Sequence, residues 1–216
     1  MNCCACDALE RQFGPASAAA DLRRYRRRGP GVTTRMLLRG LRPDLTDGAT
    51  LLDVGGGIGA LHHELLDRGV TRAWQVDPSA AYLRASREEA GRRGHGGRVE
   101  FVHGDLATAS HQVPSSDLVT LDRVVCCDPD YERLLGLALE KARRLFGFSY
   151  PRDRWGVRGT LALVNCYRRS RGLHFRGFVH PPERMESLIL GRGFTRIFTD
   201  RSIVWQVGVY VRQAAG

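Results

Sequence analysis

From residue 50 onward, short apolar runs alternate with longer segments whose apolar positions are spaced as on one face of a helix. The short runs predict five buried strands, at residues 50–54, 72–77, 98–105, 117–122 and 145–150. The longer segments predict helices at 58–69, 79–94 and 130–145. Strands that alternate with helices form right-handed β-α-β units, so we expect a parallel sheet with helices on both faces.

The last third of the chain predicts a different ending to the sheet. Residues 155–169 fit either a pair of strands or an inserted helix, and we favour the helix. Residues 182–194 have helical spacing, while 195–200 and 203–212 predict two strands joined by a short turn, which form an antiparallel hairpin. The predicted fold class is therefore α/β: a doubly wound, Rossmann-like mixed sheet of seven strands, with helices on both faces and a C-terminal antiparallel hairpin.

Residues 1–47 differ from the rest of the chain. They contain a basic stretch at 22–28, a Gly-Pro-Gly break at 29–31 and an amphipathic helical segment at 32–42. Because glycine and proline breaks separate structural units, we expect residues 1–47 to form a mobile helical lid in front of a main domain at 48–216.

Charge and composition restrict the classes of function. The formal net charge is +10, and Lys141 is the only lysine, so arginine supplies nearly all of the positive charge. A positive field favours nucleic acid or acidic small molecules as partners. No apolar run approaches the roughly 20 residues that span a membrane. The first 20 residues lack the apolar core of a secretory signal, so we expect a cytoplasmic location.

The cysteines fall into two groups and one single residue. Cys3, Cys4 and Cys6 lie close together, but not with the paired spacing of a structural zinc site. They are either reduced thiols or part of a cluster that binds a soft metal together with Cys126 and Cys127. We favour reduced thiols and expect no metal.

The stretch from Asp53 to Gly59 closes the first predicted strand and opens a helix. Gly55, Gly57 and Gly59 allow a sharp turn and a close approach of the backbone to a ligand. Their spacing, G-x-G-x-G, differs from the G-x-G-x-x-G of dinucleotide-binding loops. The Asp53 carboxylate would repel a pyrophosphate but suits a cationic ligand.

Acidic residues also end the next three strands, namely Asp77, Asp105 and Asp122. Ligands in open α/β sheets bind at the carboxyl ends of the strands, and an acid at the position of Asp77 can accept from both hydroxyls of a ribose. Each acid taken singly also fits a helix cap or a turn. Together with Asp53, the four acids predict a cofactor site at one edge of the sheet.

In this order, these motifs resemble the class I S-adenosylmethionine-dependent methyltransferases over residues 48–212, with the closest likeness to uncharacterised bacterial small-molecule members. The stretch Leu51–Gly59 resembles the family's first motif, Asp77 its ribose-binding acid, Gly104–Leu106 its adenine-binding turn, and Leu118–Arg123 its fourth motif. The resemblance implies that residues 48–216 bind S-adenosylmethionine as the cofactor. The residues that it implies for this binding are Asp53, Gly55, Gly57, Gly59, Asp77, Asp105, Leu106 and Asp122.

Methyl transfer from a sulfonium is an in-line displacement, in which the protein aligns the reacting atoms and excludes water. A general base helps when the nucleophile is a hydroxyl. His180, Tyr150 and Asp153 lie at or after the fifth strand and are candidates, although each also fits a surface or hinge position. His62 and His63, on the helix behind the glycine loop, are expected to be solvated.

We expect a small-molecule acceptor, because residues 179–194 are similar to the late helix of magnesium-protoporphyrin-type and other small-molecule O-methyltransferases. The alternative is an RNA methyltransferase that binds phosphates through the arginines of residues 22–28, which also fit the solvated face of a lid helix. Residues 128–131 resemble a signature of enzymes that methylate amino groups of nucleobases, but they do not directly end the fourth strand. We therefore do not expect nucleic acid as the partner.

Cys126 and Cys127 follow the fourth strand, at the sheet edge that faces the acceptor in this fold. We expect both to line the acceptor pocket, either by packing against an apolar acceptor or as thiolates that hold a soft metal. We favour packing, because adjacent cysteines in an extended or helical chain point in different directions.

Overall fold

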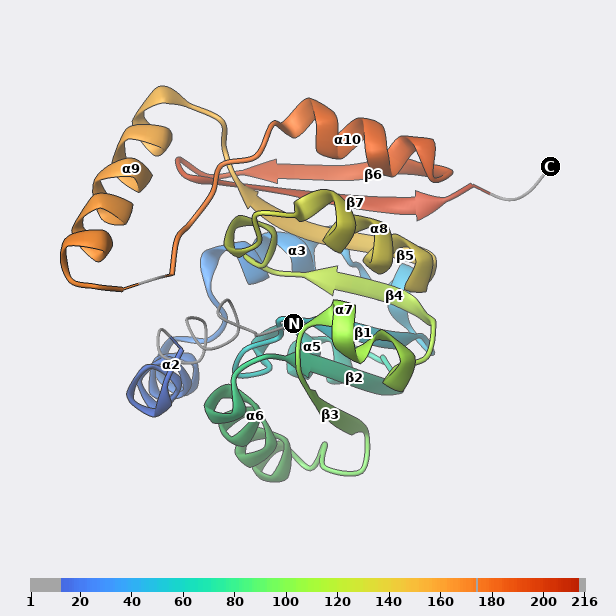
Figure 1. Cartoon of the computed structure of the whole chain (residues 1–216). Coiled ribbons are helices and arrows are strands. Elements are labelled where there is room, and N and C mark those ends of the chain that lie inside the picture. Colours follow the sequence, from blue (N-terminus) through green and yellow to red (C-terminus); the bar gives the residue numbers. More distant parts are fainter. Residues whose placement is uncertain (1–12, 174, 214–216) are drawn as a thin grey trace.

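The computed structural model describes residues 13–173 and 175–213 (Figure 1). Seven strands form one sheet in the order β3-β2-β1-β4-β5-β7-β6. The strands are β1 (Thr50–Val54), β2 (Arg72–Asp77), β3 (Val99–His103), β4 (Ser116–Leu121), β5 (Ala142–Pro151), β6 (Phe194–Arg201) and β7 (Trp205–Arg212). The first five strands are parallel, and β7 pairs antiparallel with both β5 and β6. The predicted fold class is confirmed.

Helices pack on both faces of the sheet. They are α2 (Pro15–Arg28), α3 (Val32–Gly40), α4 (Pro43–Thr46), α5 (Ala60–Leu66), α6 (Ala80–Arg93), α7 (Leu106–Ala109), α8 (Tyr131–Lys141), α9 (Trp155–Ser170) and α10 (Pro182–Gly191), with short 3-10 turns η1 (Ser110–Gln112) and η2 (Val125–Cys127). The helix favoured at 155–169 is confirmed as α9, which stands apart from the sheet in Figure 1. No helix in the described ranges is long and apolar enough to cross a membrane.

The helix expected at 130–145 is four residues shorter at its C-terminal end than predicted. Asp130 caps α8 by accepting from the amide of Arg133, and α8 ends at Lys141. Residues from Ala142 onward pair with β4 and β7 instead. The sheet's backbone hydrogen bonds override the helical spacing of the side chains there.

Alternate residues of the central strands pack into two separate apolar layers. Leu51 belongs to a cluster with α3 and α5, while its neighbour Leu52 belongs to a cluster with α7, α8 and α10. This follows from the two-residue period of a strand, which points successive side chains to opposite faces. The layers hold the sheet between helices, so the carboxyl ends of the parallel strands form a rigid edge.

The structure divides residues 1–47 differently from the predicted lid, of which residues 1–12 lie outside the described ranges. Leu37 and Leu41, at the end of α3, are fully buried in one cluster with Val207 and Val209 of β7. Helix α3 is therefore part of the main core. The sheet covers the apolar face of α3, although the predicted domain boundary at residue 47 placed this helix outside the main domain.

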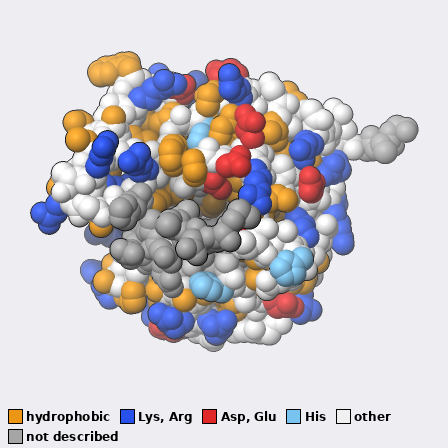
Figure 2. Space-filling model, viewed as in Figure 1, with side chains coloured by type: hydrophobic (Ala, Val, Ile, Leu, Met, Phe, Trp, Pro, Cys, Tyr) orange, Lys and Arg blue, Asp and Glu red, His pale blue; other side chains and the backbone are white. Residues whose placement is uncertain are grey.

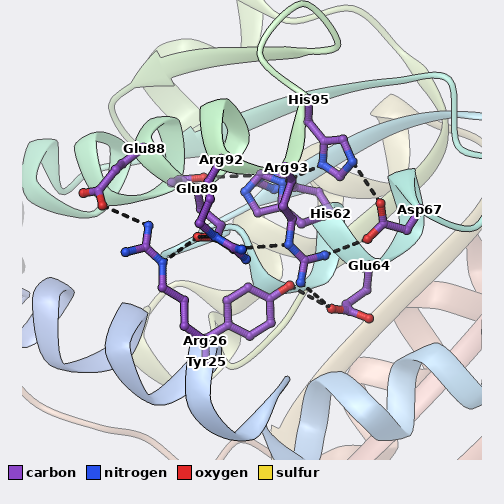
Figure 3. A network of polar contacts seen from close by, with 12 residues as sticks. Tyr25, Arg26, His62, Glu64, Asp67, Glu88, Glu89, Arg92, Arg93 and His95 are labelled. Carbon is purple, nitrogen blue, oxygen red and sulfur yellow. Dashed lines mark hydrogen bonds and ion pairs between the residues drawn. The ribbon is translucent and has the colours of Figure 1, made fainter.

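Helix α2 packs against the main domain through apolar contacts and through a network of polar contacts, the latter shown in Figure 3. Leu22 and Tyr25 are buried against α6. The Tyr25 hydroxyl donates to Glu64 (2.8 Å), and the Arg26 guanidinium pairs with the fully buried Glu89 (2.8 Å). Burial opposes the ionisation of Glu89, but hydrogen bonds from Arg92, Arg26 and Arg93 hold its pKa at about 2. In this structure the inner face of α2 is packed and paired against α6, and the mobility expected of the lid stays a prediction.

Candidate active site

A cavity of about 1480 Å³ opens at the carboxyl ends of the parallel strands. Its walls come from the glycine loop after β1, the ends of β2 and β4, the start of α7, the turn η2, α9 and the β6–β7 turn. Pockets for one small ligand commonly measure roughly 300–1,000 Å³. The volume therefore suffices for two molecules side by side.

The glycine loop forms one wall of this cavity. Gly55 (φ +62°) and Gly57 (φ +58°) line the cavity in the left-handed conformation that favours glycine. A Cβ on Gly55 would lie 2.6 Å from the side chain of Val124, so no larger residue fits there without displacement. Gly59 caps α5 and does not line the cavity, although it was predicted to bind the cofactor.

Asp77, the last residue of β2, lines the cavity beside the glycine loop. Its carboxylate accepts from the amides of Gly57 (2.9 Å) and Ser79 (2.8 Å). Burial raises the pKa of Asp77 to about 6, although the two amides oppose the shift. The side chain thus holds the loop in place and presents a carboxylate to the cavity, as the sequence predicts.

Asp105 and Leu106 line the cavity next to Asp77. The Asp105 carboxylate accepts from the amide of Thr108 (2.7 Å) and thereby caps α7. Asp105 therefore both caps α7 and lines the cavity. The cap fixes the turn that places Leu106 at the wall.

Asp53 is the exception among the four acids, since its side chain is fully buried and is not part of the cavity wall. Its carboxylate accepts from the hydroxyl of Thr120 (2.8 Å) and from Nδ1–H of His62 (3.0 Å). Burial raises the pKa of Asp53 to about 7. A Cβ on Gly56 would lie 2.5 Å from this carboxylate, so Asp53 supports the glycine loop from behind. The expectation that it borders the ligand is corrected accordingly.

The two histidines expected to be solvated are fully buried. Burial lowers the pKa of His62 to about 3, so its ring is neutral and donates from Nδ1 to Asp53. His63 places Nδ1 at 3.2 Å from Nδ1 of His95. The solvated prediction is wrong because α2 and α6 cover this side of α5, which the sequence of α5 alone does not reveal.

Replacing His62 by Leu is expected to destabilise the fold by about 1–3 kcal/mol, because it leaves a carboxylate oxygen of Asp53 buried without its donor. Chemical denaturation at pH 7 measures the change. His111→Leu, on the exposed turn η1, is the matched control and should leave stability unchanged. Equal stability of the His62→Leu variant and the parent would contradict the supporting role.

Asp122 follows β4 and lines the cavity. Its carboxylate accepts from the hydroxyls of Thr34 (2.6 Å) and Ser149 (2.7 Å). Thr34 belongs to α3, so the N-terminal segment contributes to the base of the site. The next residue, Arg123, has a left-handed backbone (φ +63°), which is uncommon for a residue other than glycine.

The structure does not bring the predicted general bases His180 and Tyr150 into this cavity. Nε2 of His180 lies 3.0 Å from the carbonyl oxygens of both Val125 and Asp128 and so donates its proton within the fold. Tyr150 is buried against Phe148, and burial raises its pKa to about 12. Asp153 does line the cavity, but its carboxylate is paired with Arg158. In this structure His180 and Tyr150 make contacts within the fold and do not line the cavity, so the geometry does not support them as general bases.

Sequence reasoning missed several wall residues, of which Tyr82 is the most informative. The Tyr82 hydroxyl donates to Asp21 of α2 (2.7 Å), and both side chains line the cavity. Its position was available from the sequence, because the Ser79 cap places it in the first turn of α6 at the sheet edge. Its partner on α2 was not, since that contact joins segments far apart in the chain.

Cys126 and Cys127 line the cavity, as predicted. Their sulfur atoms lie only 3.8 Å apart, and both thiols donate to the carbonyl of Arg123. The expectation that they point in different directions is therefore wrong, because the tight turn η2 brings both thiols to one side. The contact between the two thiols lowers the pKa of Cys127. In the ranges described, no three metal-ligating side chains gather as a group, and Cys3, Cys4 and Cys6 lie outside these ranges.

Comparison with known proteins agrees with this geometry. Residues 51–144 match a protein family described as "Methyltransferase domain". No curated protein matches the chain. Magnesium protoporphyrin IX methyltransferase from Synechocystis, solved with bound S-adenosylhomocysteine, superposes with a TM-score of 0.73 at 18% identity, over 97% of this chain and 100% of that one.

Two further solved structures are similar in fold. An O-methyltransferase family 2 protein from Planctomyces limnophilus, in complex with apigenin, has a TM-score of 0.68 at 20% identity, over 91% of this chain and 62% of that one. A putative methyltransferase from Haloferax volcanii, in complex with the activator Trm112, has a TM-score of 0.68 at 14% identity, over 96% and 99%. At these identities the likeness establishes the fold.

Proposed function

We propose that the chain is a class I S-adenosylmethionine-dependent methyltransferase and that it transfers the methyl group of S-adenosylmethionine to a small-molecule acceptor. The observation that carries the proposal is one cavity with two different halves. One half is formed by the glycine loop, Asp77 and Asp105, and the other by η2, α9 and the β6–β7 turn.

The first half fits the methyl donor. Gly55 and Gly57 leave a backbone wall without side chains, which a Cβ at Gly55 would disturb. The Asp77 carboxylate would accept from the ribose hydroxyls, and the turn at Asp105 and Leu106 would hold the adenine. Asp53 and Gly59 do not border the cavity. Asp53 supports the glycine loop from its buried side, and Gly59 caps the start of α5. The acid Asp122, fixed by two hydroxyls, borders the reacting centre.

In the mechanism, the sulfonium of the donor supplies an activated methyl group. The chain's own residues orient the acceptor and exclude water, so that the acceptor atom approaches the methyl carbon opposite the breaking bond to sulfur. Residues of helix α9 and Trp205 line the second half of the cavity. No histidine of the described residues lines the cavity, whereas the carboxylates of Asp122 and Asp153 do.

Two of the five arginines at residues 22–28 are paired within the chain, which weakens the support for RNA as the alternative acceptor. Arg24 pairs with Asp21 (3.0 Å), and Arg26 pairs with Glu88 and Glu89. Guanidinium groups already paired within the chain are less available to phosphates. The volume and apolar walls of the second half suit a small molecule better.

Calorimetry with S-adenosylhomocysteine, S-adenosylmethionine and NAD tests the proposal, together with mass spectrometry of any co-purified ligand. We expect one site per chain for the first two compounds and none for NAD. A metabolite extract incubated with labelled S-adenosylmethionine then identifies the acceptor. Binding of NAD, with no binding of either methionine derivative, would refute the proposed function.

Replacing both thiols, Cys126→Ser with Cys127→Ser, is expected to leave the affinity for S-adenosylhomocysteine unchanged and to alter turnover of the acceptor found in that screen. The reason is that both thiols lie at the second half of the cavity. Cys166→Ser, an exposed cysteine on α9, is the control. Metal content is measured in parallel. Loss of a stoichiometric metal from the double variant would contradict packing as their role.

A further inference from the structure

We propose that the acceptor carries an anionic group, such as a carboxylate or phosphate, on an apolar body, and that Arg123 and Arg168 bind this group. The inference rests on the proposed function, since it names the class of molecule that the second half of the cavity takes. It is carried by the backbone of Arg123, by the position of the two guanidinium groups and by the walls around them.

Arg123 is held in an unusual conformation directly at the site. Its φ of +63° lies in the left-handed region, which is unfavourable for a residue with a side chain. Its amide donates to the hydroxyl of Ser149 (2.7 Å), and its carbonyl accepts from the thiols of Cys126 and Cys127. Both ends of the residue are thus fixed, and the exposed side chain lies at the cavity wall. Such strain commonly marks functional positions.

Arg123 and Arg168 line the same cavity from two different elements. Arg123 comes from the end of β4 and Arg168 from α9, and both line the cavity. The field of each favours the thiolate form of Cys127, although the contact with the Cys126 thiol contributes more to lowering that pKa. The charge of Arg123 also acts on Tyr82, on the donor side. The two cations therefore lie where donor and acceptor halves join.

Neither guanidinium is neutralised by a carboxylate of the residues that the structure describes. Arg168 lies over the ring of Phe175 at 4.9 Å, and Arg123 makes no ion pair there. This contrasts with Arg26, Arg92 and Arg93, which all pair with Glu89. Two unpaired cations at one wall favour an anionic ligand, and guanidinium matches carboxylate and phosphate in geometry.

Nearby carboxylates are engaged in local structure. Asp128 accepts from the amide of Asp130 (2.8 Å), and Asp130 caps α8. Asp153 is paired with Arg158. Asp128 lies close enough to oppose the ionisation of Cys127, so it limits the positive field without pairing with either arginine.

The remaining walls of this half are apolar. Leu161 and Val164 of α9, Ile203 and Val204 of the β6–β7 turn, and Trp205 all line the cavity. Helix α9 buries no residue in the fold, so its apolar side chains are available to a ligand. In Figure 2, hydrophobic and basic side chains lie next to one another over α9, at the left of the view. An apolar body with one negative group matches this combination.

Two fluorescent probes with the same apolar body test the inference, 1-anilinonaphthalene-8-sulfonate and the uncharged N-phenyl-1-naphthylamine. Both are titrated with saturating S-adenosylhomocysteine present. We expect the sulfonate to bind at least roughly tenfold more tightly than the neutral probe. Arg123→Gln and Arg168→Gln should each weaken sulfonate binding about tenfold and leave the neutral probe unchanged. Arg123→Lys keeps the charge but loses the planar guanidinium group. Its affinity for the sulfonate should lie between those of the unsubstituted chain and Arg123→Gln.

Arg169→Gln is the matched control, because Arg169 neighbours Arg168 on α9 but does not line the cavity. Equal binding of the two probes, binding of neither, or the same sulfonate affinity in all three Gln variants would overturn the inference. Calorimetry with S-adenosylhomocysteine on each variant separates the two proposals. Retained binding of that compound leaves the proposed function standing when the anion test fails, and its loss from the unsubstituted chain contradicts the proposed function itself.

Discussion

Gly57→Val is expected to abolish binding of S-adenosylhomocysteine while the chain still folds. Gly57 lies in the left-handed region (φ +58°), which β-branched residues almost never adopt. Its amide donates to Asp77 and its carbonyl accepts from the amide group of Gln75 (2.6 Å), so the strained residue cannot rotate away without breaking both bonds. The loop would lose the shape that forms the wall of the cavity.

Calorimetry measures this loss, and thermal unfolding checks that the variant is folded. Gly97→Val is the matched control, since a Cβ on Gly97 would meet no atom within 4 Å and its φ is not positive. The control should bind as the unsubstituted chain does. A Gly57→Val variant with affinity within threefold of the control would show that the loop does not contact the donor.

Asp77→Ala is expected to weaken binding of S-adenosylhomocysteine by about 1.5–3 kcal/mol, roughly 10- to 150-fold, the range for hydrogen bonds to a charged group. Two contributions are lost together, the acceptor for the ribose hydroxyls and the acceptor for the Gly57 amide. Asp77→Asn keeps the shape of the side chain and one acceptor oxygen, so this variant should lose less affinity than Asp77→Ala. An unchanged affinity in both variants would remove Asp77 from the site.

The pKa of Asp77, raised to about 6 by burial, adds a pH dependence with opposite signs for affinity and stability. As the pH rises from 5 to 7 the carboxylate loses its proton, so affinity for the donor should rise and then level off. Stability of the free protein should fall over about pH 4–6, because the unfolded chain releases this proton near pH 4, before the folded chain does. Asp53, with a pKa near 7, contributes in the same sense to stability, so the Asp77→Asn variant isolates the share of Asp77.

Local signals in the sequence were sufficient for most of the elements, because their hydrogen bonds join residues close together in the chain. Helix α6 begins after Ser79, whose side chain accepts from the amide of Tyr82 (3.2 Å), and it ends at Gly94 in the left-handed conformation. The alternation of apolar runs with helical segments likewise predicts the parallel strands and the closing hairpin. The positions of the glycine loop and of Asp77 were likewise predictable, because each directly follows or ends a predicted strand.

Which way a side chain faces was decided only by the tertiary structure. Asp77 is the last residue of β2 and reaches the cavity, whereas Asp53 lies one residue before the end of β1, on the face of Leu51 that α5 covers. There Thr120 and His62 enclose its carboxylate. His180 and Tyr150 follow the fifth strand as predicted, yet packing turns both away from the cavity. The sequence by itself determined the order of elements and the edge of the sheet at which the chemistry gathers. The packing of distant segments decided which of those side chains border the ligand, because burial on either face depends on partners that the local sequence does not contain.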